Sequence, residues 1–177
     1  VGAVEWLWNI PILPVLEIFL IFLPLLYHAV YGLYIVFRAR NNLQNFGTFR
    51  NYMFFLQRVT GVITLLFVAW HVWQTRIQAV FLVDQPTPES LTEATAKIFQ
   101  NPVYLTLYII GIIAVVFHFS NGMWAFLVSW GITIGPRAQM ISTWVWMIVF
   151  VVLSYMGIST ALAFANEQFL QSMSALH

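Results

Sequence analysis

Four long apolar stretches dominate this sequence and restrict what it can fold into. Each is long enough to cross about 30 Å of hydrocarbon, which takes about 20 helical residues. An isolated strand cannot satisfy its backbone in lipid, and no stretch shows the strict alternation of a barrel strand. We therefore predict a single domain of the all-α class, a transmembrane helix bundle. Its helices are expected at about residues 12–37, 57–82, 103–130 and 142–165.

The charge content supports lipid as the main solvent. Charged residues make up only 7% of the chain, whereas a soluble domain carries roughly 25%. The net charge of +1 argues against nucleic acid as a partner, because phosphate binding needs clustered Lys and Arg. The chain has no cysteine, which excludes disulfides, thiol catalysis and an iron–sulfur cluster held by this chain.

The connections between these stretches differ in charge. Arginines gather in the first connection and its edges, and Arg137 lies in the third. The second connection has three acidic residues against the basic Arg76 and Lys97. By the positive-inside rule, the first and third connections are expected to face the cytoplasm. A short amphipathic surface helix is expected at residues 92–101. The arginines of the first connection are Arg38, Arg40, Arg50 and Arg58, and the acidic residues are Asp84, Glu89 and Glu93.

Three of the four histidines lie inside the predicted spans. They are His28, His71 and His118, while His177 is the last residue and is expected in a disordered tail. An ionisable residue within a span is by default a functional candidate. A single neutral imidazole could equally be hydrogen-bonded across helices. Three of them in three helices favour a cofactor, and neutral imidazole is a good ligand for haem iron.

A glycine follows two of these histidines at the same spacing. Gly32 comes four residues after His28, and Gly122 comes four residues after His118. Residues four apart share a helix face, so each glycine would leave a notch in which a flat porphyrin could lie. The alternative is that small residues simply let helices pack closely.

The depths of the histidines suggest how they pair. By helix rise, His28 lies about 15 Å from Arg38, and His118 lies about 18 Å from the interfacial Trp130. His71 is about 20 Å from the inner edge and the furthest outward. We therefore expect His28 and His118 to hold one haem iron. His71 would hold a second haem iron, and its partner is expected in a segment upstream of this sequence.

Several motifs resemble a known family, and they are spread over most of the chain, from residue 23 to residue 133, in order and at family spacing. The family is that of the di-haem cytochrome b membrane anchors of succinate dehydrogenase, the succinate:quinone oxidoreductases with one large anchor polypeptide. The motifs are LPLLYHAVYG (23–32), QRVTGVITL (57–65), WHVW (70–73), FHFSNG (117–122) and SWGIT (129–133).

The resemblance implies a five-helix anchor that binds two b haems through four histidines. His28 and His118 match the ligands of the haem nearer the hydrophilic subunits, and His71 matches one ligand of the distal haem. The remaining ligand belongs to a first helix that this sequence lacks. The resemblance also implies a non-flavin subunit of respiratory complex II, an enzyme of the tricarboxylic acid cycle, in a bacterial cytoplasmic membrane. Its partners would be a flavoprotein subunit, an iron–sulfur subunit and a quinone, for which menaquinone is suggested.

Polar residues near the inner edge are candidates to bind haem propionates. Topology signalling and lipid head-group contact explain the arginines among them at least as well. Arg58 is the strongest, because the RVTG motif resembles one common across these anchors. The candidates are Arg38, Arg58 and Arg137, with Tyr27, Ser120 and Asn121 as hydrogen-bonding groups.

Glu17 is a candidate for a quinone site. It lies about 16 Å outward of His28 by helix rise and could exchange protons with quinone. An interfacial carboxylate just after Pro14 is the simpler interpretation.

Two other functions share these features. Another bis-histidine cytochrome b, such as the quinone-reactive subunit of a nitrate reductase, formate dehydrogenase or hydrogenase, would have similar spans and histidines but different motifs. A haem-free transporter would use the histidines as proton relays.

Overall fold

The computed structural model describes residues 6, 10–78, 88–166, 168 and 171. Within these residues the chain is helical and no strand is found. Four helical segments are long and apolar enough to cross a membrane: Leu13–Arg38, Phe49–Ile77, Pro102–Ser129 and Pro136–Ala165. The predicted all-α transmembrane bundle is thus confirmed. The expectations for His177 and Asp84 lie outside the described residues.

The first span consists of three consecutive helical segments. They are α2 (Leu13–Leu16), the π-helical η1 (Glu17–Phe22) and α3 (Leu23–Arg38). Proline is tolerated in the first turn of a helix because the N–H that it lacks has no intrahelical partner there, and Pro14 occupies that position in α2. The span ends where Ala39 becomes extended.

The second span consists of α4 (Phe49–Val72) and the π-helical η2 (Trp73–Ile77). It begins at Phe49 rather than near residue 57. The reason is a cap: the Thr48 side chain accepts a hydrogen bond from the Asn51 N–H at 3.4 Å. A capped N-terminus lets the helix extend through polar residues beyond the hydrocarbon.

The short helix α6 (Pro88–Gln100) precedes the third span, α7 (Pro102–Ser129). Its exposed Glu93 is hydrogen-bonded to Lys97 at 2.8 Å, which lowers the pKa of the Glu93 carboxyl. Asn101 separates α6 from α7. The Asn101 Oδ1 accepts hydrogen bonds from the N–H groups of Val103 and Tyr104, at 2.9 and 3.3 Å, and therefore caps α7.

The fourth span, α8 (Pro136–Ala165), begins before the predicted residue 142. Gly131 and Gly135 in the preceding turn have φ of 68° and 84°, a region that glycine enters without a steric penalty. Pro136 then starts the helix with its fixed φ.

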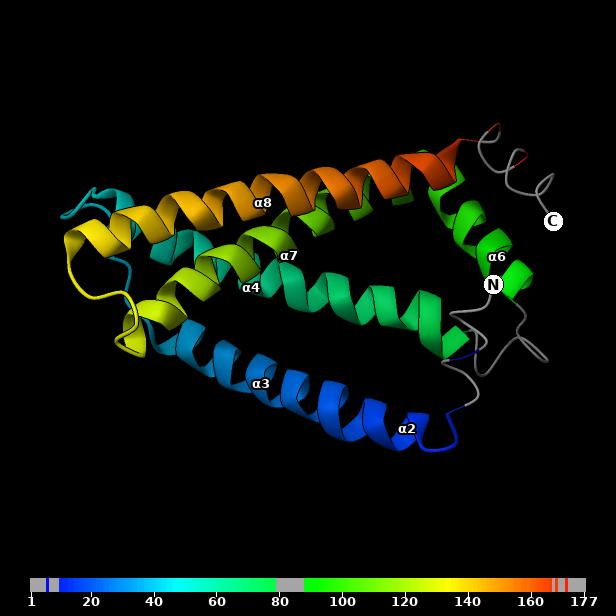
Figure 1. Ribbon diagram of the computed structural model, residues 1–177, viewed down its shortest axis with the longest axis horizontal. Coiled ribbons are helices and arrows are strands. Elements are labelled where there is room, and N and C mark those ends of the chain that lie inside the picture. Colours follow the sequence, from blue (N-terminus) through cyan, green and yellow to red (C-terminus); the bar gives the residue numbers. More distant parts are fainter. Residues whose placement is uncertain (1–5, 7–9, 79–87, 167, 169–170, 172–177) are drawn as a thin grey trace.

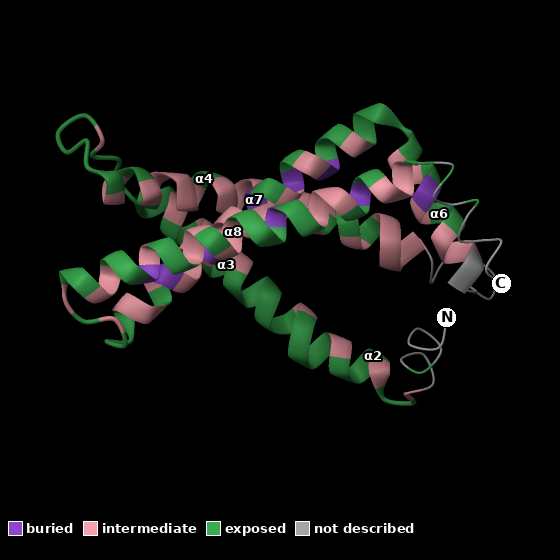
Figure 2. Ribbon diagram, turned by 45° about the horizontal axis from the view of Figure 1, so that its top comes forward, coloured by how far each residue is buried: buried purple, intermediate pink, exposed green. Residues whose placement is uncertain are grey.

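Helix α7 forms the centre of the bundle, with α4 and α8 packed against it and α6 across α7 and α8 (Figure 1). The buried residues of the spans lie on α7 and α8, and no residue of α3 is buried. Helix α3 contacts α4 and diverges from it toward α2, so that most of its surface is exposed (Figure 2). The α3–α4 and α7–α8 connections lie together at the opposite end from α6.

Candidate functional site

The imidazole rings of His28 on α3 and His118 on α7 are neighbours. Their ring centroids are 6.1 Å apart and their planes are inclined by 78°. A metal–imidazole bond is about 2 Å long and the ring centroid lies about 1 Å behind its nitrogen, so two imidazoles on opposite sides of one ion have centroids about 6 Å apart. The observed separation therefore fits two axial ligands of one haem iron.

The protonation of His118 follows from its hydrogen bond to α4. The His118 Nδ1 lies 3.1 Å from the backbone oxygen of Gln57. A carbonyl oxygen can only accept, so Nδ1 carries the proton and Nε2 keeps its lone pair. A metal-binding histidine commonly donates its second ring N–H in this way. The His118 tautomer is therefore the one that can bind iron through Nε2.

Two further residues of α4 hold His118 in place, and the sequence prediction missed both. The Gln57 Nε2 donates to the His118 backbone oxygen at 3.0 Å. A Cβ at Gly61 would lie 2.9 Å from the His118 Cε1, so this glycine makes room for the imidazole. Gln57 and Gly61 are four residues apart and share a face of α4. The only signal for them in the sequence is their position in the QRVTG motif.

His71 lies near the other end of α4, in contact with α7. Its Nδ1 is 3.3 Å from the Tyr108 hydroxyl, and its ring stacks on Phe67 with centroids 6.0 Å apart. Tyr108 comes ten residues before His118 on α7, which is about 15 Å along the helix. His71 and the His28–His118 pair are thus at two different levels of the bundle. Tyr108 was also missed by the sequence prediction.

Within the described part of the chain, no group of three or more His, Cys, Asp or Glu side chains could hold a bare metal ion. Haem iron takes four equatorial ligands from the porphyrin and needs only axial ligands from protein. The paired histidines therefore suit haem rather than a free cation.

The two predicted glycine notches differ. A Cβ at Gly32 would meet no atom within 4 Å, so the surface of α3 beside His28 is open. A Cβ at Gly122 would lie 3.1 Å from the Gln57 Nε2. Gly122 therefore faces the side chain of Gln57, which corresponds to the alternative of close helix packing.

The predicted cationic candidates lie toward the α3–α4 connection and the start of α8. The Arg58 guanidinium donates to the Asn41 Oδ1 at 3.2 Å and to the Phe54 backbone oxygen at 3.3 Å. Arg38 lies over the Tyr34 ring, 5.7 Å from its centroid. Arg137 is exposed in the first turn of α8. None of these contacts involves a histidine.

The predicted hydrogen-bonding candidates also lie apart from the histidines. Tyr27 is 72% exposed on α3. Asn121 donates to the Gln57 Oε1 at 2.7 Å and to the Met53 backbone oxygen at 3.2 Å. Ser120 is buried, and its hydroxyl has no hydrogen-bond partner among the described residues. It is about 200° around α7 from His118, which favours a packing role.

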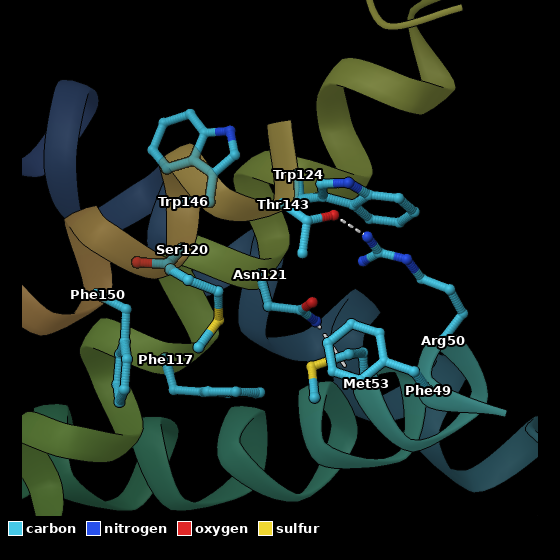
Figure 3. Close-up of a pocket in the computed structure, with 11 residues that line it drawn as sticks. Phe49, Arg50, Met53, Phe117, Ser120, Asn121, Trp124, Thr143, Trp146 and Phe150 are labelled. Carbon is cyan, nitrogen blue, oxygen red and sulfur yellow. Dashed lines mark hydrogen bonds between the residues drawn. The ribbon is translucent and has the colours of Figure 1, made fainter. Parts of the chain in front are cut away.

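Ser120 and Asn121 line a small apolar pocket between α4, α7 and α8 (Figure 3). Arg50 lies at this pocket with its guanidinium carbon 3.5 Å from the centroid of the Trp124 ring, and it donates a hydrogen bond to the Thr143 hydroxyl. The pocket is therefore on a different side of α7 from the His28–His118 pair.

Glu17 forms an ion pair with Arg76. The Glu17 Oε2 and Arg76 Nη2 are 2.7 Å apart, and both side chains are more than two-thirds covered. The pair joins η1 of the first span to η2 of the second, and π-helical turns are frequent at functional sites. Arg76 was not among the predicted site residues.

Comparison with known proteins decides the family. The model of the family described as "Succinate dehydrogenase/Fumarate reductase transmembrane subunit" matches residues 38–157. The chain belongs to this family. It is also 51% identical, over 163 residues, to the succinate dehydrogenase cytochrome b558 subunit of Bacillus subtilis (strain 168), an alignment that covers 92% of this chain and 78% of that protein. No solved structure matches significantly.

Membership confirms the resemblance that the sequence motifs indicated. The chain is an integral membrane subunit of the succinate dehydrogenase and fumarate reductase type, and therefore part of an enzyme complex. His71 and His118 lie within residues 38–157, which match the family model, and His28 precedes them in the first span.

Proposed function

We propose that this subunit binds b haem and passes electrons from an iron–sulfur partner subunit to quinone. The observation that carries the proposal is the His28–His118 pair, whose 6.1 Å separation suits the two axial positions of one iron. His28 and His118 would together hold the haem iron, which suits electron transfer rather than oxygen binding. The name of the Bacillus subtilis relative, a cytochrome b558 subunit, supports a b-type haem.

The residues of this chain would bind and orient the cofactor. His28 and His118 supply the ligands, and Gln57 fixes the His118 tautomer. His71 would be one axial ligand of a second haem at another level, and its second ligand is not among the described residues. When bound, haem supplies one-electron transfer. Arg38, Arg58 and Arg137 remain candidates to bind propionates through side-chain motion.

The same proposal includes the partners and the quinone site. Flavoprotein and iron–sulfur subunits would bind on the cytoplasmic side, at the α3–α4 and α7–α8 connections. The quinone, for which menaquinone is the candidate, would bind near Glu17. Glu17 already forms an ion pair with Arg76. A quinone that exchanges protons with the Glu17 carboxylate would have to displace Arg76 from it.

Single histidine variants test the haem ligands. His28→Ala and His118→Ala should each remove the same haem, and His71→Ala should remove the other, so that each loses about half of the b-type absorbance. Reduced-minus-oxidised spectra and electron paramagnetic resonance of the purified complex measure this. If His28→Ala and His71→Ala removed a common haem, the pairing would be wrong.

Copurification tests the proposed partner subunits, and turnover tests the proposed quinone site. A flavoprotein with covalent flavin should accompany the subunit, whereas a molybdenum or nickel subunit would contradict the proposal. Glu17→Gln should lower the kcat of succinate-dependent quinone reduction, while reduction of a soluble dye by the hydrophilic subunits stays unchanged. Equal rates with quinone in Glu17→Gln and the parent complex would exclude Glu17 from the quinone site.

A further inference from the structure

A chain of hydrogen bonds connects His71 to the interior of the bundle. The His71 Nδ1 lies 3.3 Å from the hydroxyl oxygen of Tyr108, and this hydroxyl donates to the Gln74 Oε1 at 3.0 Å. Tyr108 is only 3% exposed. His71 and Gln74 belong to the second span and Tyr108 to the third. These hydrogen bonds therefore connect a candidate haem ligand to a buried residue of another helix.

The donors and acceptors of this chain fix the protonation of His71. The Oε1 of an amide can only accept a hydrogen bond, and a phenol has one proton to give. Tyr108 gives that proton to Gln74, so its oxygen can only accept from His71. The His71 Nδ1 must then carry the proton, which leaves Nε2 with its lone pair. Gln74 thus sets the direction of the hydrogen bond between Tyr108 and His71.

Aromatic packing holds Tyr108 in the position that this requires. Its ring packs against Phe99, with centroids 4.7 Å apart, and against Trp70, with centroids 4.9 Å apart. Phe67 contacts both Tyr108 and His71, stacks on the imidazole and occupies the space beside Gly111. A side chain packed on several faces has few alternative rotamers. Packing therefore keeps the Tyr108 side chain in the rotamer that places its hydroxyl at the imidazole of His71.

We propose that Tyr108, oriented by Gln74, is a positioning residue that sets the orientation and electron-donating strength of His71 as an axial ligand. The proposal rests on the proposed function of His71. Accepting the Nδ1 proton makes the imidazole a stronger donor to a metal. A stronger axial donor stabilises ferric over ferrous iron and lowers the midpoint potential. Tyr108 would thus lower the potential of the haem bound through His71.

The test is a redox titration of the whole purified complex with Tyr108→Phe. This change keeps the ring and its packing but removes the acceptor for the His71 proton. We expect the midpoint potential of one haem to rise and its low-spin resonance to shift, while the other haem keeps both properties. Gln74→Leu should shift the potential of the same haem, since it removes the group that orients the hydroxyl.

Tyr104→Phe is the matched control. Tyr104 lies one turn away on α7 and packs on the same Trp70, with ring centroids 5.8 Å apart. Its hydroxyl makes no hydrogen bond to His71 among the described residues, so both potentials should stay unchanged. Selective loss of one haem in Tyr108→Phe but not in Tyr104→Phe would also support the proposal.

Two results would overturn it. Unchanged potentials in Tyr108→Phe would mean that the hydrogen bond only joins two helices. Loss of both haems would mean that the hydroxyl supports the whole bundle rather than one ligand. Failure of the underlying function is distinguishable, because His71→Ala would then leave both haems in place.

Discussion

The space around His118 depends on the absence of one side chain. Gly61 has no Cβ, and a Cβ there would lie 2.9 Å from the His118 Cε1. The imidazole cannot yield easily, because its Nδ1 is hydrogen-bonded to the backbone of Gln57, one turn earlier on α4. Overpacking of this kind typically costs about 1–3 kcal/mol. The position should therefore be sensitive to a single methyl group.

Gly61→Ala should lower the occupancy of the haem bound by His28 and His118, or shift its resonance, because it displaces His118. The matched control is Gly157→Ala on α8, where the new Cβ would lie 2.9 Å from the Ile112 Cγ2. Both variants introduce equal crowding, but only the first touches a ligand. Haem content per complex and electron paramagnetic resonance measure the difference. Equal effects of the two variants would mean that crowding alone is responsible.

Gly32→Leu tests the notch beside His28. No atom lies within 4 Å of a Cβ built at Gly32, so the larger side chain should leave the protein fold intact. If a porphyrin lies against this part of α3, leucine competes with it, and most of the haem of the His28 pair should be lost. Pyridine haemochrome analysis of the complex gives the haem content. Full retention of both haems would place the porphyrin elsewhere.

At the residue scale, the sequence indicates the candidate haem ligands but not the residues that hydrogen-bond to them. Histidines stand out because ionisable groups are costly in apolar spans. Gln57 and Tyr108 do not stand out, because their roles arise from contacts between α4 and α7 that no local pattern encodes. Ser120 was a candidate to bind a haem propionate because of its polar side chain, and the structure adds that it lies about 200° around α7 from His118.

At the scale of elements, hydropathy locates the spans well because about 20 apolar residues are needed to cross the bilayer. The starts of the first and third spans agree to one residue with the prediction, but those of the second and fourth do not. Helix α4 begins at Phe49 and α8 at Pro136, in polar and basic sequence that belongs to the interface. These starts are set by Thr48 and by the turn at Gly135, which are local capping signals rather than hydrophobic ones.

The cap of α7 gives a prediction about stability. Asn101→Ala removes the acceptor for two N–H groups at the start of the central helix. Loss of such a cap costs about 1 kcal/mol, so the midpoint of thermal unfolding of this subunit should fall. Thermal scans of the purified complex measure the change.

Asn101→Asp is the control for this cap. Aspartate keeps a side-chain oxygen and adds a favourable charge at a helix N-terminus, so its midpoint should match or exceed that of the parent. If Asn101→Ala and Asn101→Asp lowered the midpoint equally, the cap would contribute nothing.

At the scale of the whole molecule, the ends of the spans divide into two sets. The α3–α4 and α7–α8 connections lie at one end, and α6 lies at the other (Figure 1). The arginines at the first end predict that it is cytoplasmic. The sequence has no cysteine, so single cysteines can be introduced into it as markers.

Asn45→Cys in the α3–α4 connection should be protected from a membrane-impermeant maleimide in intact cells. It should become labelled when the membrane is opened in urea, which removes the partner subunits proposed to cover this connection. Ala94→Cys on the exposed side of α6 should be labelled in both. The two exposed sites are controls for each other. Labelling of Asn45→Cys, but not of Ala94→Cys, in intact cells would reverse the proposed orientation.

Helix α3 is covalently joined to the bundle but hardly buried in it. It carries His28, one of the two candidate ligands whose ring centroids lie 6.1 Å apart. A cofactor that binds both would therefore fasten α3 to α7, in addition to carrying electrons. Without the cofactor, the first span would be held to the others mainly by its contacts with α4 and by the Glu17–Arg76 ion pair. We therefore expect cofactor binding to complete the assembly of the bundle.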